Sequence, residues 1–290
     1  MKFSGSYVAI VTPFHPDGSV NFDKLKELVK WHLAEGTDGI VALGTTGESS
    51  TMSHEEDDEV ARCVIETVNG RIPVICGAGS NSTQTQLEKS RKYHDMGADG
   101  LLLITPYYNK ANDEGMYRHF ATVADTVDTP IILYNVPGRT GCAISPACCA
   151  RLAKHPNVAG IKEASGNISY AAQIAKLLND DFCMFSGNDD MIVPMMSLGA
   201  VGVISVWANI CPKESHDLVA AFAAGNVAKA REIQLKYLEL INTLFCEVNP
   251  IPIKEAMNQL GMGVGGYRLP LCEISDAGRE KVRCALEVLR

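Results

Sequence analysis

Lys162 stands at the end of a short apolar run, where an amphipathic pattern would not place a charged residue. The run 158–161 follows Pro156 and leads into the polar segment 163–166, which predicts a buried strand that enters a loop. An amine attacks a carbonyl only when it is neutral, and an unperturbed lysine pKa of about 10.4 leaves about one amine in 2,500 neutral at pH 7. Because burial lowers the pKa of an amine, a lysine at the rim of a buried site is a candidate Schiff-base nucleophile. The alternative is a structural lysine that pairs with Glu163 or extends to solvent.

Other chemically useful side chains stand at or just after the ends of similar apolar runs. Each has an ordinary explanation, since threonines cap helices, tyrosines fill cores and an arginine after Pro-Gly is often a solvated turn residue. Together they supply an amine, phenols, hydroxyls and a guanidinium, which are the groups that a carbonyl-condensing enzyme requires. The candidates beside Lys162 are Thr45, Thr46, Tyr107, Tyr108, Tyr134, Arg139, Gly187 and Ile204.

The apolar runs alternate with amphipathic stretches along most of the chain. Eight continuously apolar runs are expected for a parallel sheet that is covered on both faces. They lie at 7–12, 39–43, 73–76, 100–104, 131–135, 158–162, 182–186 and 202–206. The helical stretches between them lie at 21–35, 54–68, 83–96, 114–127, 146–154, 169–178, 190–198 and 212–224. Eight such units predict an α/β fold, a closed (β/α)8 TIM barrel, whose functional groups gather at the carboxyl ends of the strands.

After the eighth unit, the pattern continues as helix without strand, at 227–245, 253–260 and 275–289. We therefore predict a barrel over residues 1–225 that carries the active site, followed by a C-terminal helical extension over 226–290. The rival architecture is a doubly wound open sheet. It would need a phosphate-binding loop after the first strand, and the segment 12–16 offers none. The glycines at 77 and 79 lack the third glycine of a dinucleotide fingerprint.

Composition excludes several classes of function. The chain has 290 residues and a formal net charge of -8, which argues against nucleic acid or an anionic membrane as the main partner. Its ten cysteines form no Cys-x-x-Cys pair and its seven histidines show no ligand spacing, so we expect neither a metal nor a cofactor. The chain begins without a secretory pattern and contains no apolar stretch of membrane-spanning length. We expect a cytoplasmic protein whose cysteines are mainly small core residues.

Several separate motifs, in order along nearly the whole chain, resemble those of the dihydrodipicolinate synthases, which belong to the Schiff-base, pyruvate-dependent class I aldolase family. The motifs are GTTGE at 44–48, TPYYN at 105–109, YNVPGRT at 134–140, IKEASG at 161–166, GVISV at 202–206 and NPIPIK at 249–254. The resemblance implies a lyase that condenses pyruvate with L-aspartate-4-semialdehyde to 4-hydroxy-tetrahydrodipicolinate, in lysine and diaminopimelate biosynthesis. It also implies a homotetramer, built as a dimer of dimers.

The resemblance assigns a role to each candidate residue. Lys162 matches the position that forms the imine with pyruvate, and Tyr134 matches the proton donor and acceptor. Thr45 and Tyr108 match the partners of that tyrosine in a proton relay, the latter reaching in from a neighbouring subunit. The substrate-binding positions are Thr46, Ile204, Arg139 and Gly187, with Arg139 receiving the carboxylate of the second substrate. An effector site for lysine is matched by Ser49, His54, Asn81 and Tyr107.

Two departures from the family's pattern bear on regulation. Asp57 and Thr85 fall where a histidine and a glutamate are common in lysine-inhibited members, so we expect weak or absent inhibition. Other activities remain open as alternatives: N-acetylneuraminate lyase, a keto-deoxy-sugar aldolase, or a non-catalytic binding module built on the barrel. Thr45 and Arg139 favour the synthase, because the neuraminate lyase branch generally has Ser-Thr and lacks this arginine.

Overall fold

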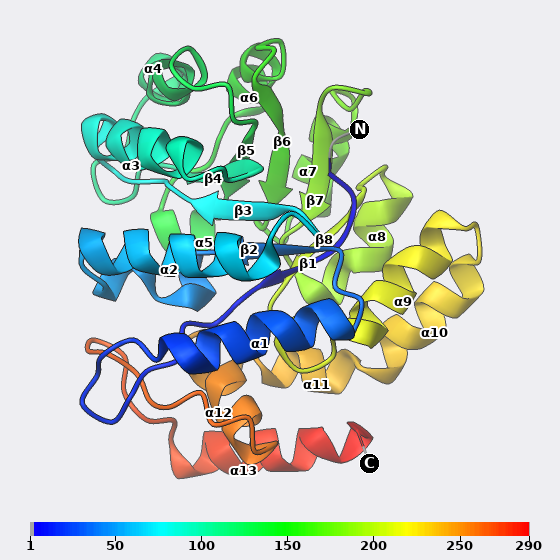
Figure 1. Cartoon of the computed structure of the whole chain (residues 1–290). Helices are drawn as coiled ribbons and strands as arrows, with labels where there is room; N and C mark the ends of the chain where they lie inside the picture. Colours follow the sequence, from blue (N-terminus) through cyan, green and yellow to red (C-terminus); the bar gives the residue numbers. More distant parts are fainter. Residues whose placement is uncertain (1–2, 290) are drawn as a thin grey trace.

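The computed structural model describes residues 3–289, and its centre is a closed barrel of eight parallel strands (Figure 1). Each strand pairs with the next along the chain, and β1 pairs with β8 to close the ring. The predicted (β/α)8 barrel is therefore confirmed, and the open sheet is excluded. The strands are β1 (Gly5–Ala9), β2 (Gly39–Ala42), β3 (Val74–Gly77), β4 (Gly100–Ile104), β5 (Ile131–Asn135), β6 (Val158–Glu163), β7 (Cys183–Ser186) and β8 (Gly202–Ser205).

The prediction was least accurate for the first strand. It placed the strand at 7–12, whereas β1 runs from Gly5 to Ala9. The backbone N–H of Val11 donates to the side-chain oxygen of Asn209 at 3.1 Å instead of to a neighbouring strand. A contact between residues so far apart in sequence cannot be read from local periodicity. The predicted bounds of β4 and β5 match the structure.

Helices surround the barrel and cover the outer face of its sheet. They are α1 (Phe22–Ala34), α2 (His54–Val68), α3 (Thr83–Asp95), α4 (Asp113–Ala124), α5 (Pro137–Thr140), α6 (Pro146–Leu152), α7 (Ile168–Ala175), α8 (Ile192–Ser197) and α9 (Pro212–Ala223). Side-chain caps begin many of them, and in α2 the Ser53 hydroxyl and the Glu56 carboxylate form a reciprocal capping box. The stretch predicted as one helix at 190–198 starts with a 3₁₀ turn, η3 (Asp189–Met191), before α8.

The apolar core has two parts, one between strands and helices and a smaller one inside the barrel. Strand residues alternate between them, because successive side chains point to opposite faces of a sheet. Tyr7 and Phe185 fill the barrel interior, with ring centroids 5.2 Å apart. Gly160 of β6 also faces this interior, where a Cβ would lie 2.5 Å from the carbonyl oxygen of Cys183. The interior below the strand ends is therefore solidly packed.

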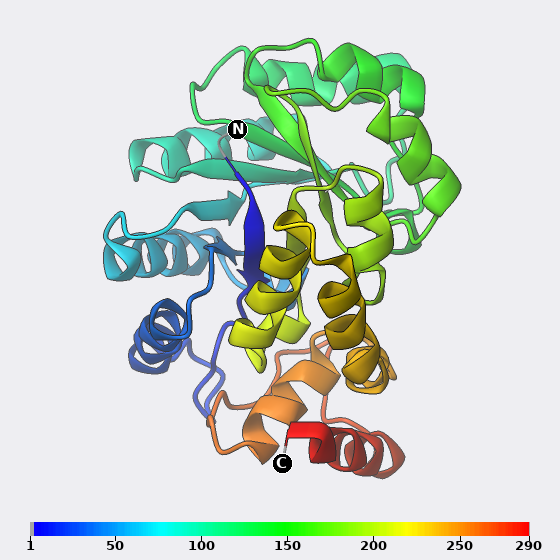
Figure 2. The same ribbon diagram turned by 90° about the vertical axis from the view of Figure 1, so that its right-hand side faces the viewer.

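The C-terminal helices are α10 (Val227–Lys236), α11 (Leu238–Thr243), α12 (Ile251–Gln259) and α13 (Asp276–Ala285). In both overall views α12 and α13 gather at one end of the molecule, beneath α1 and α11 (Figure 2). The stretch predicted as one helix at 227–245 is interrupted at Tyr237. The ring of Tyr237 packs on that of Trp207, with the two ring centroids 5.1 Å apart. The division into residues 1–225 and 226–290 stays a prediction, and residues 1, 2 and 290 at its outer ends lie outside the described part.

Two further sequence expectations concern cysteines and membranes. All ten cysteines are free, and six of them are buried, as expected for core residues. Cys272 and Cys284 are exposed, so the core interpretation is wrong for these two. Within residues 3–289, no helix combines the length and apolar character needed to cross a membrane.

Candidate active site

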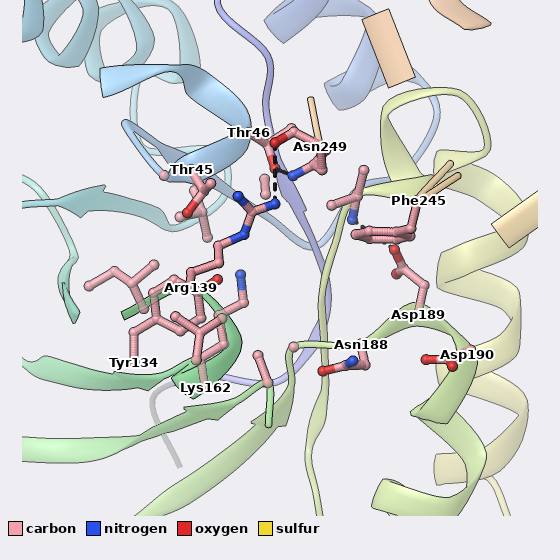
Figure 3. Close-up of a pocket in the computed structure, with 18 of the residues that line it drawn as sticks. Thr45, Thr46, Tyr134, Arg139, Lys162, Asn188, Asp189, Asp190, Phe245 and Asn249 are labelled. Atoms are coloured by element: carbon pink, nitrogen blue, oxygen red, sulfur yellow. Dashed lines mark hydrogen bonds between the residues drawn. The ribbon is translucent and has the colours of Figure 1, made fainter. Parts of the chain in front are cut away.

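Lys162 and Tyr134 are brought together by the pairing of β5 with β6, in which their Cα positions are register partners. Both side chains point into a cavity of about 340 Å³ at the carboxyl ends of the strands (Figure 3). The Nζ atom of Lys162 lies 4.4 Å from the centroid of the Tyr134 ring, and the two residues are only 6% and 7% exposed. The cavity therefore holds an amine and a phenol in contact, largely shielded from water.

Glu163 does not pair with Lys162, which removes the structural alternative raised by the sequence. Adjacent residues of a strand point to opposite faces, and the Glu163 carboxylate accepts hydrogen bonds from Asn135 and Ser165 instead. Burial raises the pKa of the Glu163 carboxyl, and these hydrogen bonds oppose the increase. Among the described residues, no ion pair joins Lys162 to a carboxylate.

The threonine loop, residues 44–48, forms another wall of the cavity. It contains the 3₁₀ turn η1 (Thr45–Gly47), and the two residues that flank this turn region, Leu43 and Glu48, have left-handed backbone conformations with φ of 59° and 54°. Such conformations are costly for residues with a β-carbon and persist only where the surroundings enforce them. Thr46 is buried, whereas Thr45 is half-buried. Both threonines line the same cavity as Lys162.

Asn249, from the loop between α11 and α12, links the threonine loop to Arg139. Its side-chain amide donates to the Thr46 hydroxyl at 3.0 Å, and its backbone carbonyl accepts from the Arg139 guanidinium at 3.2 Å (Figure 3). The side-chain oxygen of Asn249 is buried and has no hydrogen-bond partner within residues 3–289. Sequence reasoning did not select this residue for the site. Its only local signal is a polar side chain directly before Pro250.

Asp189, at the start of η3, also lines the cavity, whereas the site residue predicted from this strand end was Gly187. One carboxylate oxygen accepts from the backbone N–H groups of Val206 and Trp207, at 2.9 and 3.0 Å. The other oxygen is buried without a hydrogen-bond partner among the described residues. Burial raises the pKa of the Asp189 carboxyl, while the Ser205 hydroxyl, the two N–H groups and the charge of Lys162 oppose the increase.

The structure brings most of the predicted catalytic and substrate-binding residues to this one cavity. Those that line it are Thr45, Thr46, Tyr134, Arg139, Lys162 and Gly187. At Gly187 a Cβ would lie 2.5 Å from the Cβ of Ala164, so only glycine fits this approach of two loops. Ile204 is fully buried in the barrel interior and does not line the cavity. Tyr108 is 93% exposed, with φ of 71°, and also lies outside it.

A second cavity, of about 440 Å³, adjoins the first and shares Thr45, Tyr134 and Arg139 with it. Of the predicted effector residues, Ser49, His54 and Tyr107 line it. Asn81 does not, because its side chain donates to the backbone carbonyl of Tyr107.

Asp57 and Lys89 also line the second cavity and form a buried ion pair. Their charged atoms lie 2.6 Å apart, and the Ser49 hydroxyl donates to the same carboxylate oxygen at 3.0 Å. Burial raises the pKa of the Asp57 carboxyl, and the charge of Lys89 opposes this. The carboxylate in this cavity therefore already has a cationic partner from the chain itself.

No group of three or more histidine, cysteine or acidic side chains that could hold a metal ion occurs within residues 3–289. The functional groups described above are an amine, a phenol, a guanidinium and hydroxyls, around a cavity at the carboxyl ends of the barrel strands. The fold and this cavity define the chain as a (β/α)8-barrel protein whose candidate site lies at the usual mouth of that fold.

The chain belongs to the dihydrodipicolinate synthetase family, because the model of that family matches residues 2–289. It is 53% identical over 284 residues to a 4-hydroxy-tetrahydrodipicolinate synthase of Caldicellulosiruptor bescii, covering 98% of this chain and 96% of that protein. It is 50% identical over 285 residues to the enzyme of the same name from Clostridium novyi, with the same coverage. A solved structure of the chloride-inhibited dihydrodipicolinate synthase from Acinetobacter baumannii, complexed with pyruvate, superposes with a TM-score of 0.96 at 45% identity, covering 98% of each chain.

The buried carboxyl of Asp189 leads to a prediction about stability and pH. A carboxyl whose pKa is raised by folding keeps its proton in the folded state, while the unfolded chain loses it near pH 3.9. The free energy of unfolding therefore falls as the pH rises from the unfolded towards the folded pKa. Asp189→Asn removes this loss, so the stability of the variant relative to the original chain should increase as the pH rises above about 3.9.

Urea unfolding at a series of pH values measures this difference. Asp190→Asn, at the exposed neighbouring position, is the matched control. A stability difference for Asp189→Asn that is independent of pH, or that moves in the opposite direction, would contradict the assignment.

Proposed function

We propose that this protein is a 4-hydroxy-tetrahydrodipicolinate synthase, which condenses pyruvate with L-aspartate-4-semialdehyde through a Schiff base on Lys162. The observation that carries the proposal is the buried contact between the Lys162 amine and the Tyr134 ring, in a cavity that the Arg139 guanidinium and the threonine loop also line. Support comes from relatives of that name at about half identity over nearly the whole chain and from the related structure that holds pyruvate.

The first step is capture of pyruvate. Its carboxylate binds at Thr46, and its keto carbon faces the Lys162 amine. Ile204 supports the pyruvate site from the packed barrel interior, without lining the cavity. The neutral amine adds to that carbon, and the resulting carbinolamine takes up one proton through Tyr134 and loses one water to give a protonated imine. The positive nitrogen withdraws electrons, so the methyl group can lose a proton and become an enamine nucleophile.

The proton transfers belong to Tyr134 and its relay. A phenol is a weak base alone, because its unperturbed pKa is about 10. A chain of hydroxyls from Tyr134 through Thr45 to Tyr108 lets one proton move between the phenol and bulk water at each step. Since Tyr108 is exposed at a distance from the cavity of its own chain, we assign its contribution to the site of a neighbouring subunit.

The second substrate binds by its carboxylate. Arg139, at the mouth of the cavity, offers a two-pronged guanidinium, and Gly187 leaves room beside it. The enamine carbon attacks the aldehyde, whose oxygen takes a proton from Tyr134. The amino group of the joined product then attacks the imine carbon and displaces Lys162, which closes the ring and frees the amine. The water lost at the first step is the only by-product.

The remaining assignments concern assembly and location. We infer a homotetramer built as a dimer of dimers, in which the exposed Tyr107 and Tyr108 of one subunit lie against another. We infer a cytoplasmic enzyme whose partners are its two small substrates, without nucleic acid or membrane. The reaction needs no cofactor, because the imine nitrogen itself serves as the electron acceptor.

Trapping with borohydride tests the proposal. Pyruvate and borohydride should add the mass of a reduced pyruvate adduct to Lys162, because borohydride reduces an imine to a stable amine. Lys162→Met should lose both the adduct and at least about a thousandfold in kcat/KM. Lys229→Met, on the exposed part of α10, is the matched control and should retain both.

The choice of second substrate separates the synthase from its alternatives. Aspartate-4-semialdehyde should be consumed with pyruvate, whereas N-acetylmannosamine should not. Turnover of the sugar would favour a neuraminate lyase, and the absence of any adduct would favour a binding module.

Arg139→Ala tests the second-substrate site. Loss of a charge-assisted hydrogen bond should raise the KM for the semialdehyde about tenfold to a hundredfold, with little change in the KM for pyruvate. For Arg139→Lys, the KM for the semialdehyde should lie between that of the original chain and that of Arg139→Ala. Lysine keeps the positive charge but lacks the planar, two-pronged guanidinium. Steady-state kinetics with each substrate varied gives both constants, and an equal increase in the two would refute this role.

Lysine should inhibit the enzyme weakly or not at all. An effector ammonium needs an unpaired carboxylate, and Lys89 already neutralises Asp57 in the second cavity, while Thr85 brings no charge. The missing charge-assisted hydrogen bond weakens binding by about 1–3 kcal/mol. Assays with increasing lysine measure this, and half-maximal inhibition well below about 1 mM would contradict it.

A further inference from the structure

Glu48, the last residue of the threonine loop, forms a completely buried ion pair with Lys254. The two charged atoms are 2.8 Å apart, and both side chains are 0% exposed. Lys254 also donates to the backbone carbonyls of Thr12, at 3.1 Å, and of Gly266. The mechanism proposed above uses neither residue.

The surroundings of Lys254 are apolar as well as polar. Its Nζ atom lies 4.4 Å from the centroid of the Phe14 ring and 5.4 Å from that of Tyr267. Burial lowers the pKa of Lys254, and the charge of Glu48 opposes this. A buried ion pair carries a large desolvation cost, and an apolar pair of similar volume often stabilises a fold as well or better. Stability alone is therefore a poor explanation for this pair.

The threonine loop and the segment 249–254 are joined by a second contact, at the wall of the cavity. Glu48 follows Thr46 by two residues, and Lys254, in the first turn of α12, follows Asn249 by five. The ion pair joins residues 48 and 254, whereas the hydrogen bond from Asn249 joins residues 46 and 249. Two parallel cross-links thus hold the threonine loop against the loop that precedes α12.

The ion pair also meets the strained part of the threonine loop. Glu48 has a left-handed backbone with φ of 54°, which is costly for a residue with a β-carbon and which its buried side-chain contacts help to stabilise. One oxygen of the Glu48 carboxylate accepts a hydrogen bond from the Lys254 amine. The other accepts a long hydrogen bond, of 3.5 Å, from the backbone N–H of Arg268. The C-terminal extension therefore holds this carboxylate from two positions.

We propose that Glu48 and Lys254 are positioning residues, whose buried ion pair fixes the Asn249 bridge between Thr46 and Arg139. The C-terminal extension is then part of the active-site architecture, although neither charged side chain lines the cavity. The proposal rests on the proposed function for its kinetic consequence, since Thr46 and Arg139 are there assigned to the two substrate carboxylates. Lys162 and Tyr134 lie on β6 and β5, outside these cross-links.

The test uses a double variant, Glu48→Gln with Lys254→Met, because a single change would leave one buried charge without its partner. The matched control is Glu56→Gln. It removes a different ion pair between the same extension and α2, that of Glu56 with Arg268 at 2.6 Å, and the glutamine keeps the helix cap. Thermal unfolding of each full-length variant confirms that it is folded.

At saturating pyruvate, the double variant should lose about tenfold in kcat/KM for the semialdehyde, while borohydride still traps pyruvate on Lys162. Asn249→Ala should lose a similar factor. Combining it with the double variant should add little, because changes that act through one contact are not additive. Glu56→Gln should leave kcat/KM unchanged.

Hydrogen exchange supplies a readout that does not depend on the reaction. In the double variant, the amides of residues 44–48 should exchange about tenfold faster, with the barrel strands unchanged. Any of four results would overturn the assignment. Three are kinetic: additive losses of kcat/KM when Asn249→Ala is combined with the double variant, an unchanged kcat/KM in the double variant, or an equal loss in Glu56→Gln. The fourth is amide exchange that becomes faster throughout the chain. If the original chain failed to condense its substrates, the proposed function would fall, and hydrogen exchange would decide the positioning role by itself.

Discussion

Closure of the sheet by the pairing of β1 with β8 is the constraint on which the rest of the structure depends. A closed parallel barrel brings all eight carboxyl ends to one rim, so residues more than a hundred positions apart share one cavity. This closure explains why one cavity is lined by Thr46, Tyr134 and Lys162. The packed interior beneath them, with Tyr7 against Phe185, gives the cavity a solid floor.

Burial of polar groups is the second theme of the molecule. Lys162, Glu163 and Asp189 lie under the rim with little exposure, where a charged group without partners is costly. The Glu163 carboxylate accepts hydrogen bonds from Asn135 and Ser165 on the outer face of β6, and these offset the cost of its burial. Asp189 keeps one oxygen unpartnered beside the cavity.

Much of the site could be predicted because its main residues are marked locally. A lysine that ends an apolar run and an arginine after Pro-Gly are visible without a structure, and both line the cavity. Asn249 lies in the motif at 249–254 and Asp189 follows the seventh strand, but neither residue type indicated locally that its side chain would reach the cavity. The assignment of Asn81 to the effector site stays a prediction, and its side-chain amide donates to the backbone carbonyl of Tyr107.

The order and type of the main elements follow from local sequence patterns, because burial on both faces requires continuously apolar strands and burial on one face requires amphipathic helices. These patterns also show which reactive side chains stand at the strand ends. Only the tertiary structure decided how the C-terminal extension meets the barrel, through Asn249 with Thr46 and Lys254 with Glu48. These contacts join residues about two hundred positions apart, and periodicity along the chain carries no information about such pairs.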